Sequence, residues 1–164
     1  MQMLHSFSKS MNSIAVGIAI SEGKLKLDDL VVDHFREYLP EKYDRRIDQL
    51  TVRNLLTMAA NSCRLSTCFR GVTSSWIKHY FTYELPHDPG TVFQYDTGAS
   101  YMLSSLVSKT MHKNVLELMK ERVFGPMEIT DVEWLESPEG NTVGGWGLYL
   151  KTPDIAKIAI LLAN

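Results

Sequence analysis

The sequence has only two cysteines, no long hydrophobic run and no excess of charge of either sign. Its formal net charge is −2 at pH 7, so it lacks the basic surface that binds nucleic acids and anionic membranes. The longest apolar run, Ile14 to Ile20, is too short to cross a bilayer. The opening "MQMLHS" lacks the charged and apolar regions of a signal peptide. As written, the sequence predicts a cytoplasmic protein with no nucleic-acid partner and no membrane segment, although a chain without its native start would give the same prediction.

The two cysteines, Cys63 and Cys68, lie in the segment "NSCRLSTC". A zinc site needs about four ligands, and no histidine lies at ligand spacing from this pair. We expect reduced, partly buried thiols here, with a local disulfide as the alternative. The sequence also carries no motif for ATP, NAD or a metal ion, so we expect no cofactor and no metal ligands.

The composition, 45% hydrophobic and 22% charged residues, is typical of a globular protein, and we expect a single domain over residues 1–164. Hydrophobic spacing and capping residues predict helices over residues 7–22, 52–60, 74–83, 98–111, 115–124 and 153–163, with a short helix or turn in 30–40. Residues 7–22 are apolar on most sides, which is typical of an enclosed central helix. Little strand is expected apart from the extended segment "TVFQY", so the fold is predicted to be mainly α.

The spacing S-x-x-K occurs three times, at Ser6/Lys9, Ser21/Lys24 and Ser75/Lys78. Because random placement of 14 serines and 10 lysines predicts about 0.9 such pairs, the spacing alone carries no weight. Only the first pair opens the enclosed helix, where residues i and i+3 share a face and the helix dipole favours developing negative charge. Ser6 and Lys9 are therefore candidates for an activated nucleophile and its base. The alternative is a helix-capping serine beside a surface lysine.

The second candidate group lies in "PGTVFQYDTGASYMLSSLV". If "TVFQY" is extended, Tyr95 and Thr97 project on one side and Asp96 on the other. A phenol and a hydroxyl would then lie side by side just before a helix. The alternative assigns Tyr95 to the core and makes Thr97 or Asp96 the N-cap of the helix.

Six segments, in order, resemble the conserved blocks of one enzyme group: "SFSK", "EGKLKLDDLVVDHFREYLPE", "LTVRNLLTMAA", "PGTVFQYDTGASYMLSSLV", "ERVFGPMEITDVEW" and "GGWGLYLKTPDIAKIAILLAN". The group is the serine β-lactamase-related hydrolases, which hold class C β-lactamases, low-molecular-weight penicillin-binding proteins and related esterases. The resemblance implies that Ser6 is the acylated nucleophile and that its backbone N–H is one oxyanion donor. It further implies Lys9 as base or proton relay, Tyr95 as proton carrier and Thr97 as a substrate-binding residue. The implied reaction is acyl transfer to water from an amide, β-lactam or ester.

The chain departs from this family in two ways. Thr97 stands where the family commonly has Asn, which weakens the expectation of β-lactam recognition more than that of general hydrolysis. The family's K-T-G or H-x-G strand also has no counterpart, because Lys151-Thr152-Pro153 opens a helix.

The same resemblance implies strands before and after the matched region, whereas only five residues precede Ser6. We therefore expect the helical subdomain and central nucleophile helix of the serine β-lactamase-like fold, truncated at both ends, with most of the α/β domain's antiparallel sheet missing from this chain. Weak or absent activity, and a homo-oligomer through exposed apolar surface, are expected to follow. A non-catalytic helical remnant or binding module of the same fold, and an unrelated all-helical interaction protein, remain as alternatives.

Overall fold

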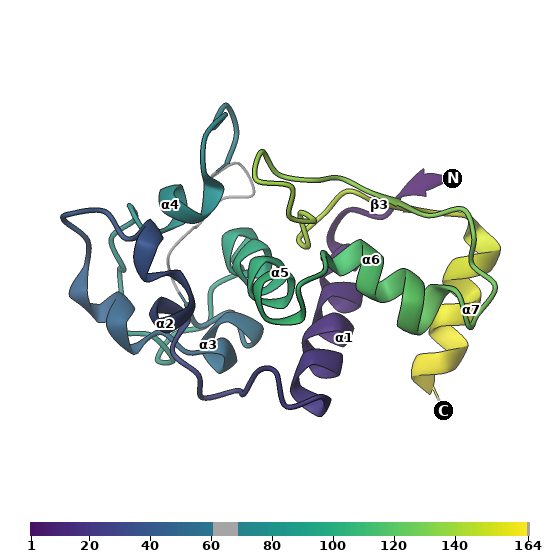
Figure 1. Ribbon diagram of the computed structural model, residues 1–164, viewed down its shortest axis with the longest axis horizontal. Helices are drawn as coiled ribbons and strands as arrows, with labels where there is room; N and C mark the ends of the chain where they lie inside the picture. The colour runs from purple at the N-terminus through teal and green to yellow at the C-terminus, as the bar shows by residue number, and fades with distance from the viewer. Residues whose placement is uncertain (61–68, 164) are drawn as a thin grey trace.

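The computed structural model describes residues 1–60 and 69–163, so the two cysteines lie outside the described residues. Helices dominate, and the prediction of a mainly α fold is confirmed (Figure 1). The α-helices are α1 (Ser8–Ser21), α2 (Val31–Phe35), α3 (Val52–Leu56), α4 (Trp76–Tyr80), α5 (Thr97–Met111), α6 (Val115–Met119) and α7 (Thr152–Ala163). Tighter or wider helical turns are η1 (His5–Phe7), η2 (Arg36–Tyr38), η3 (Arg45–Gln49) and the π-helical η4 (Lys120–Phe124).

A small antiparallel sheet joins the start of the chain to residues near 150. Its strands are β1 (Gln2–Met3), β2 (Glu133–Trp134) and β3 (Leu148–Leu150), in the order β1-β3-β2. Gln2 pairs with Leu150 and Trp134 pairs with Leu148. The Leu4 N–H then donates to the Leu148 carbonyl over 2.8 Å, which extends the pairing to the residue before η1. The sheet thus fixes the segment that leads into the first helix.

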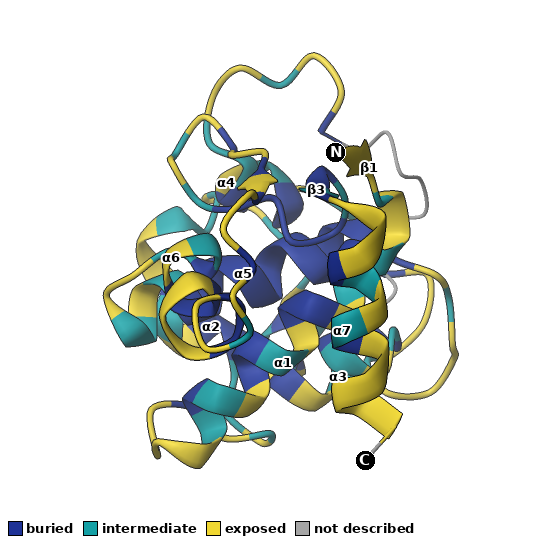
Figure 2. Cartoon of the chain, turned by 90° about the vertical axis from the view of Figure 1, so that its right-hand side faces the viewer, coloured by how far each residue is buried: buried dark blue, intermediate teal, exposed yellow. Residues whose placement is uncertain are grey.

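Helix α5 forms the centre of the molecule and contacts α1, α2, α3, α4 and α6 (Figure 1). Its largest helix–helix contact is with α1, on which Ala15 and Ala19 are fully buried. Met102 and Leu106 on α5 are also fully buried. Burying a side chain of that size stabilises the fold by about 1.5–3 kcal/mol. The dark-blue core in Figure 2 follows these two helices.

Several helix boundaries follow the capping residues in the sequence. Thr51 begins α3 with a capping box to Asn54, and Asn114 begins α6 with a capping box to Glu117. Gly23, with φ of +67°, ends the first helix as expected. The helix expected over 74–83 is shorter, since α4 covers only Trp76–Tyr80. The segment expected as one helix over 115–124 changes from α6 to the π-helical η4.

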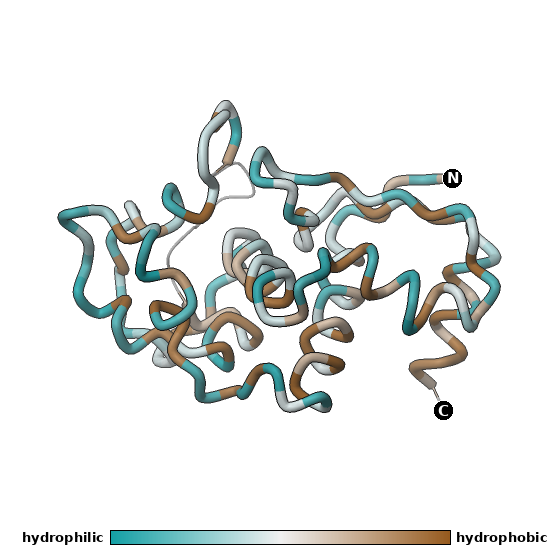
Figure 3. Tube along the Cα trace, viewed as in Figure 1, coloured by the Kyte–Doolittle hydropathy of each residue, from teal (hydrophilic) through white to brown (hydrophobic). Residues whose placement is uncertain are grey.

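Helix α1 is not enclosed on all sides, so that prediction was wrong for one face. Its exposed stripe consists of small residues, namely Ser10, Ser13, Gly17 and Ser21. A run of exposed apolar residues lies instead on the last turns of α7, where Ile160, Leu161 and Leu162 are each at least half exposed (Figures 2 and 3). The apolarity of residues 14–20 is explained by the packing of Ala15, Val16 and Ala19 against the core rather than by burial all round.

Candidate active site

Ser6 and Lys9 lie where the short turn η1 passes into α1. The Lys9 ammonium donates a hydrogen bond of 3.4 Å to Ser6 Oγ, so the i and i+3 positions share a face as the spacing predicts. His5, immediately before the serine, has a positive φ of 40°. This left-handed residue turns the chain from the sheet segment into η1 and presents Ser6 at the surface.

Tyr95 reaches the same serine from a distant part of the chain. Its phenol donates a hydrogen bond of 2.6 Å to Ser6 Oγ. The Lys9 ammonium lies 4.9 Å from the centroid of the Tyr95 ring. The structure therefore brings Ser6, Lys9 and Tyr95 together, with the serine oxygen between the other two groups.

The pKa of Tyr95 lies below its usual value near 10. Partial burial raises this pKa, but the hydrogen bond with Ser6 and the nearby charge of Lys9 lower it by more. A nearby cation stabilises a phenolate relative to the neutral phenol. Tyr95 is thus tuned toward the form that can accept a proton from the serine hydroxyl.

A backbone carbonyl fixes the other side of Lys9. The ammonium donates a hydrogen bond of 2.7 Å to the Gly145 carbonyl, across a sequence separation of 136 residues. The preceding Gly144 has φ of +71°, and a Cβ there would lie 2.8 Å from the Cβ of Ser104 and 2.9 Å from the Ser100 carbonyl. Only glycine fits such a position without displacement. The close approach of this loop to α5 therefore places the carbonyl that binds Lys9. The sequence analysis did not predict this contact, and its signal in the sequence is the Gly144-Gly145 dipeptide, since glycine permits close approach of the backbone.

Thr97 is buried, with 3% of its surface exposed, at the first position of α5. The N-cap is Asp96, whose carboxylate accepts the Ala99 N–H over 2.9 Å, which decides between the two expected caps. Asp96 points into the helix start while Tyr95 reaches Ser6. Thr97 contributes to the wall of a cavity of about 310 Å³, which is lined by His5, Ser6, Lys9, Thr97, Gly145 and Trp146.

The segment that carries Tyr95 belongs to no strand of the sheet. It is attached to the residues that follow α3 by two backbone hydrogen bonds of 2.8 Å, from the Gly90 N–H to the Ala59 carbonyl and from the Gln94 N–H to the Met58 carbonyl. Because these bonds lead to the turn after a helix and not to a neighbouring strand, no ladder develops. Two local anchors, rather than a sheet, set the position of Tyr95.

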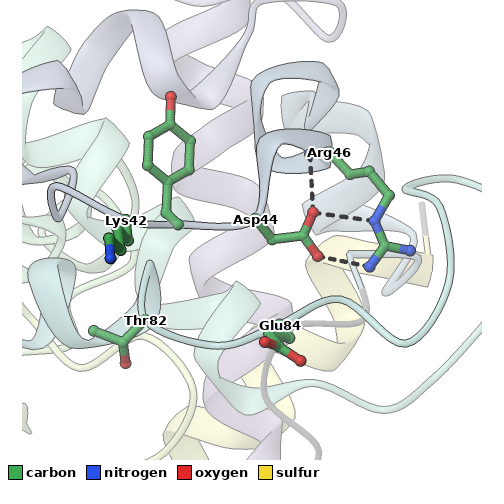
Figure 4. A pocket seen from close by; sticks show the side chains of 6 residues that line it. Lys42, Asp44, Arg46, Thr82 and Glu84 are labelled. Atoms are coloured by element: carbon green, nitrogen blue, oxygen red, sulfur yellow. Dashed lines mark hydrogen bonds and ion pairs between the residues drawn. The ribbon is translucent and has the colours of Figure 1, made fainter.

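A charged clamp, whose ion pair between Asp44 and Arg46 is shown in Figure 4, holds Leu85, upstream of the segment that carries Tyr95. The Asp44 carboxylate accepts two hydrogen bonds from the Arg46 guanidinium and one of 3.0 Å from the Leu85 N–H. Arg46 also donates to the Leu85 carbonyl. The Arg46 pair, together with the Leu85 N–H, lowers the pKa of Asp44 to about 2 despite the cost of burial. Two of the charged residues that line the hollow in Figure 4, Asp44 and Arg46, are therefore paired with each other.

The other two S-x-x-K pairs have local structural roles. Ser75 Oγ accepts the Lys78 N–H as the N-cap of α4, and Ser21 donates to the Ile18 carbonyl at the end of α1. Lys151-Thr152-Pro153 opens α7, and Lys151 forms an ion pair with Asp131.

The beta-lactamase family model matches residues 1–162. The chain belongs to the beta-lactamase family. Among solved structures, this beta-lactamase-family chain is similar to a Bacillus anthracis protein described as a 6-aminohexanoate-dimer hydrolase, with a TM-score of 0.81 and 14% sequence identity. The match covers 98% of this chain and 47% of the other, so this beta-lactamase-family chain spans about half the length of that structure. At this identity the likeness shows the fold. No curated protein matches the chain.

Two further findings concern ligands and membranes in this beta-lactamase-family chain. Over residues 1–60 and 69–163, no three His, Cys, Asp or Glu side chains are grouped so that they could hold a metal ion. No helix within the same ranges combines the length and hydrophobicity needed to cross a bilayer.

Proposed function

We propose that the chain catalyses acyl transfer from an amide, β-lactam or ester to water, with Ser6 as nucleophile. The observation that carries the proposal is the 2.6 Å hydrogen bond between the Tyr95 phenol and Ser6 Oγ, beside the Lys9 ammonium at 3.4 Å from the same oxygen. A serine hydroxyl is a weak nucleophile unless a base removes its proton. Tyr95, with its lowered pKa, supplies that base.

In the first half-reaction, the Tyr95 phenolate takes the Ser6 proton while Oγ attacks the substrate carbonyl carbon. The negative charge moves to the carbonyl oxygen, where the Ser6 backbone N–H is the proposed donor. The bond to the leaving group then breaks, and Tyr95 passes its proton to the departing nitrogen or oxygen. The acyl group is now joined to Ser6 Oγ as an ester. In the second half-reaction, Tyr95 takes a proton from water, and the resulting hydroxide attacks the carbonyl carbon of this acyl-enzyme. The bond to Ser6 Oγ then breaks, the acid is released, and Tyr95 returns the proton to Ser6.

The role of Lys9 follows from its two hydrogen bonds. One N–H is directed at the Gly145 carbonyl, and this bond holds the ammonium beside the serine. Its positive charge stabilises the Tyr95 phenolate before attack. Lys9 can also relay a proton between the serine oxygen and the leaving group, since its ammonium already donates to Ser6 Oγ.

The substrate class rests on the residue types that line the cavity. Thr97 has a hydroxyl where the enzymes of the resemblance commonly have the side-chain amide of Asn. An amide offers an N–H donor and a separate carbonyl acceptor to the substrate, whereas Thr97 offers a single oxygen. Esters and simple amides are therefore better candidates than β-lactams. A linear amide dimer of 6-aminohexanoate, as in the name of the similar structure, is one amide to test.

We expect slow turnover from this chain. The resemblance implies a second oxyanion donor on a K-T-G or H-x-G strand, and the chain's own Lys151-Thr152-Pro153 begins a helix. Removing one such donor costs about 10²–10³ in rate in comparable sites. The alternative is a non-catalytic helical module in which the same contacts are purely structural.

The deciding experiment is covalent labelling with a fluorescent activated ester and a fluorescent β-lactam. We expect labelling of the native chain and none of Ser6→Ala. Ser10→Ala is the matched control, because Ser10 is exposed and four residues along from Ser6. Mass spectrometry of the labelled peptide identifies the modified serine. Far-UV circular dichroism checks that the native chain is folded. If the folded chain shows no Ser6-dependent label with either probe, the result contradicts the hydrolase proposal and favours the non-catalytic module.

A further inference from the structure

Asn12 lies about one helical turn after Lys9 on α1 and is buried, with 1% of its surface exposed. Its amide nitrogen donates a hydrogen bond of 2.8 Å to the Ser100 carbonyl on α5. The side chain therefore crosses the contact between two helices that both serve the candidate site. Helix α1 carries Lys9, and α5 begins two residues after Tyr95.

The same amide packs against the glycine turn, formed by Gly144 and Gly145, that binds Lys9. A Cβ added at Gly144 would lie 2.9 Å from Asn12 Nδ2 and 2.9 Å from the Ser100 carbonyl oxygen. The backbone of the turn thus rests on the amide and on the carbonyl to which the amide donates. The next residue, Gly145, supplies the carbonyl that accepts the Lys9 ammonium over 2.7 Å. Consecutive residues of the turn therefore contact two side chains that are neighbours on one face of α1.

The stability of the fold does not account for an amide at this position. The Ser100 carbonyl lies in the first turn of α5, where the Ser104 N–H is its partner in the regular helical pattern. The other polar atom of the amide, Asn12 Oδ1, is buried and has no hydrogen-bond partner within residues 1–60 and 69–163. A buried acceptor without a partner costs free energy, whereas an apolar side chain of similar shape does not. The contact with the glycine turn gives the amide a physical reason to be there.

We propose that Asn12 is a positioning residue that acts through Lys9. Its amide holds the glycine turn against α1 and α5, and the Gly145 carbonyl in turn keeps the Lys9 ammonium beside Ser6. The inference rests on the proposed acyl transfer and adds a residue that is not among those lining the cavity. Without the amide, the ammonium can move away from Ser6 and Tyr95. The phenolate of Tyr95 is then less stabilised by the positive charge.

The kinetic test compares acylation of Ser6 by the fluorescent ester in the native chain, Asn12→Leu and Asn12→Ser. We expect both variants to be acylated about 10–100-fold more slowly, the scale of a catalytic group displaced by up to about 1 Å. The urea midpoint of Asn12→Leu should not fall, because the unpartnered acceptor is removed with the amide. Asn12→Ser adds no volume, so a loss of rate shared by the two variants cannot come from overpacking. An unchanged rate in both would overturn the inference.

A double-mutant cycle distinguishes positioning from a general loss of structure. In Lys9→Gln the ammonium is absent, so adding Asn12→Leu should slow acylation by less than about twofold further. The pH at which acylation rises should also move upward in Asn12→Leu, and by no more than in Lys9→Gln. Lys9 is the charged side chain that acts on the Tyr95 phenol, and His5, which lines the same cavity, is unchanged in these variants. Independent, multiplicative losses in the double variant would overturn the inference.

Ser105→Ala is the matched control. Ser105 is also 1% exposed, and its hydroxyl donates to another carbonyl of α5, that of Tyr101, over 3.1 Å. The substitution therefore removes a buried side-chain hydrogen bond to the same helix, at a residue that is not among those nearest to the glycine turn. Its acylation rate should equal that of the native chain. Equal losses in Ser105→Ala and Asn12→Leu would contradict a role through the turn.

A measurement on Lys9 itself separates this inference from the hydrolase proposal. In the Ser6→Ala chain, acetic anhydride modifies lysine amines, and mass spectrometry gives the rate at Lys9 relative to the exposed Lys24. Adding Asn12→Leu should raise this ratio about threefold or more, since the released lysine loses a hydrogen bond that favours its charged, unreactive form. Ser6-dependent labelling with an unchanged ratio would overturn the positioning role alone. A raised ratio without any Ser6-dependent labelling would overturn the hydrolase proposal and support Asn12 as the residue that positions Lys9.

Discussion

Tyr95 donates a hydrogen bond of 2.6 Å to Ser6 Oγ across 89 residues of sequence. Neither residue lies in a long helix or in the sheet. Ser6 is held by η1 between the sheet and α1, whereas Tyr95 is held by bonds from its segment to the end of α3. The distance between the two oxygens therefore depends on how α1, α3 and α5 pack. Changes in either anchor should act on the same contact.

Replacing Tyr95 by Phe removes the phenol and keeps the ring. We expect the acylation rate of Ser6 to fall by about 10²–10⁴-fold, the range for loss of a positioned general base. Stability should change little, because Tyr95 is 47% exposed. Rates of labelling by the fluorescent ester, with circular dichroism as a check on folding, provide the measurement. Equal labelling rates in the two chains would show that Tyr95 is not the base.

The lowered pKa of Tyr95 predicts the pH dependence of acylation. The phenolate is the active form, so the rate should rise with pH, with a midpoint below the usual pKa of tyrosine, and it should be lost as the pH falls through this pKa. Replacing Lys9 by Gln removes the charge that favours the phenolate, and the rise should then move to higher pH. Labelling rates between pH 5 and pH 10, corrected for hydrolysis of the free probe, test both statements. A rise at the same pH in Lys9→Gln would contradict the assignment of the titrating group to Tyr95.

Gly144→Ala should displace the loop whose next carbonyl binds Lys9. The new methyl group meets the Cβ of Ser104 at 2.8 Å, and alanine is also strained at φ of +71°. We expect a loss of about 2–4 kcal/mol in the free energy of unfolding, from the sum of backbone strain and overpacking. The acylation rate should fall as well, since the Gly145 carbonyl moves.

The matched control for that substitution is Gly140→Ala. Gly140 has a similar φ of +80°, but nothing lies within 4 Å of an added Cβ. It should lose only the backbone contribution, about 1 kcal/mol, with no effect on acylation. Urea unfolding of both variants gives the comparison. Equal destabilisation would show that the close approach of the loop to α5 has no energetic weight.

The sequence contains the information for local structure more directly than for the site. Thr51 and Asn114 predict helix starts because a cap acts within three residues of itself. The clamp between Asp44 and Leu85 and the bond from Lys9 to the Gly145 carbonyl span 41 and 136 residues. No periodicity encodes such pairs, because they arise from the packing of separate helices.

The predicted meeting of Ser6 with Tyr95 came from the resemblance to a family, since neither short motif was informative alone. The extent of burial around α1 could not be predicted from the sequence either, because it depends on which elements pack against each face of the helix. Apolar residues on most sides of a helix do not reveal that Ser10, Ser13 and Gly17 share an exposed stripe until the neighbouring elements are placed.

The Asp44 clamp should make stability depend on acid pH. The Arg46 guanidinium lowers the folded-state pKa of Asp44 from 3.8 to about 2. A group with a depressed folded-state pKa stabilises the fold above its unfolded-state pKa, and this contribution is lost as the pH falls from about 4 to about 2. Asp44→Asn should therefore reduce the free energy of unfolding at pH 7 by about 1.5–3 kcal/mol, the range for a hydrogen bond to a charged group. The difference from the native chain should narrow at pH 2.5.

Asp33→Asn is the control for this substitution, because Asp33 pairs with Arg36 on the surface, where both side chains are at least half exposed. Such pairs contribute about 0–1 kcal/mol. Urea unfolding at pH 7 and pH 2.5, followed by tryptophan fluorescence and far-UV circular dichroism, measures both variants. Coincident transitions from the two probes are expected if residues 1–164 form a single domain, as we propose.

Asp44→Asn should also slow acylation of Ser6, since the clamp holds the segment that leads to Tyr95, whereas Asp33→Asn should not. Loss of stability without any slowing would show that the two backbone bonds at Gly90 and Gln94 position Tyr95 by themselves.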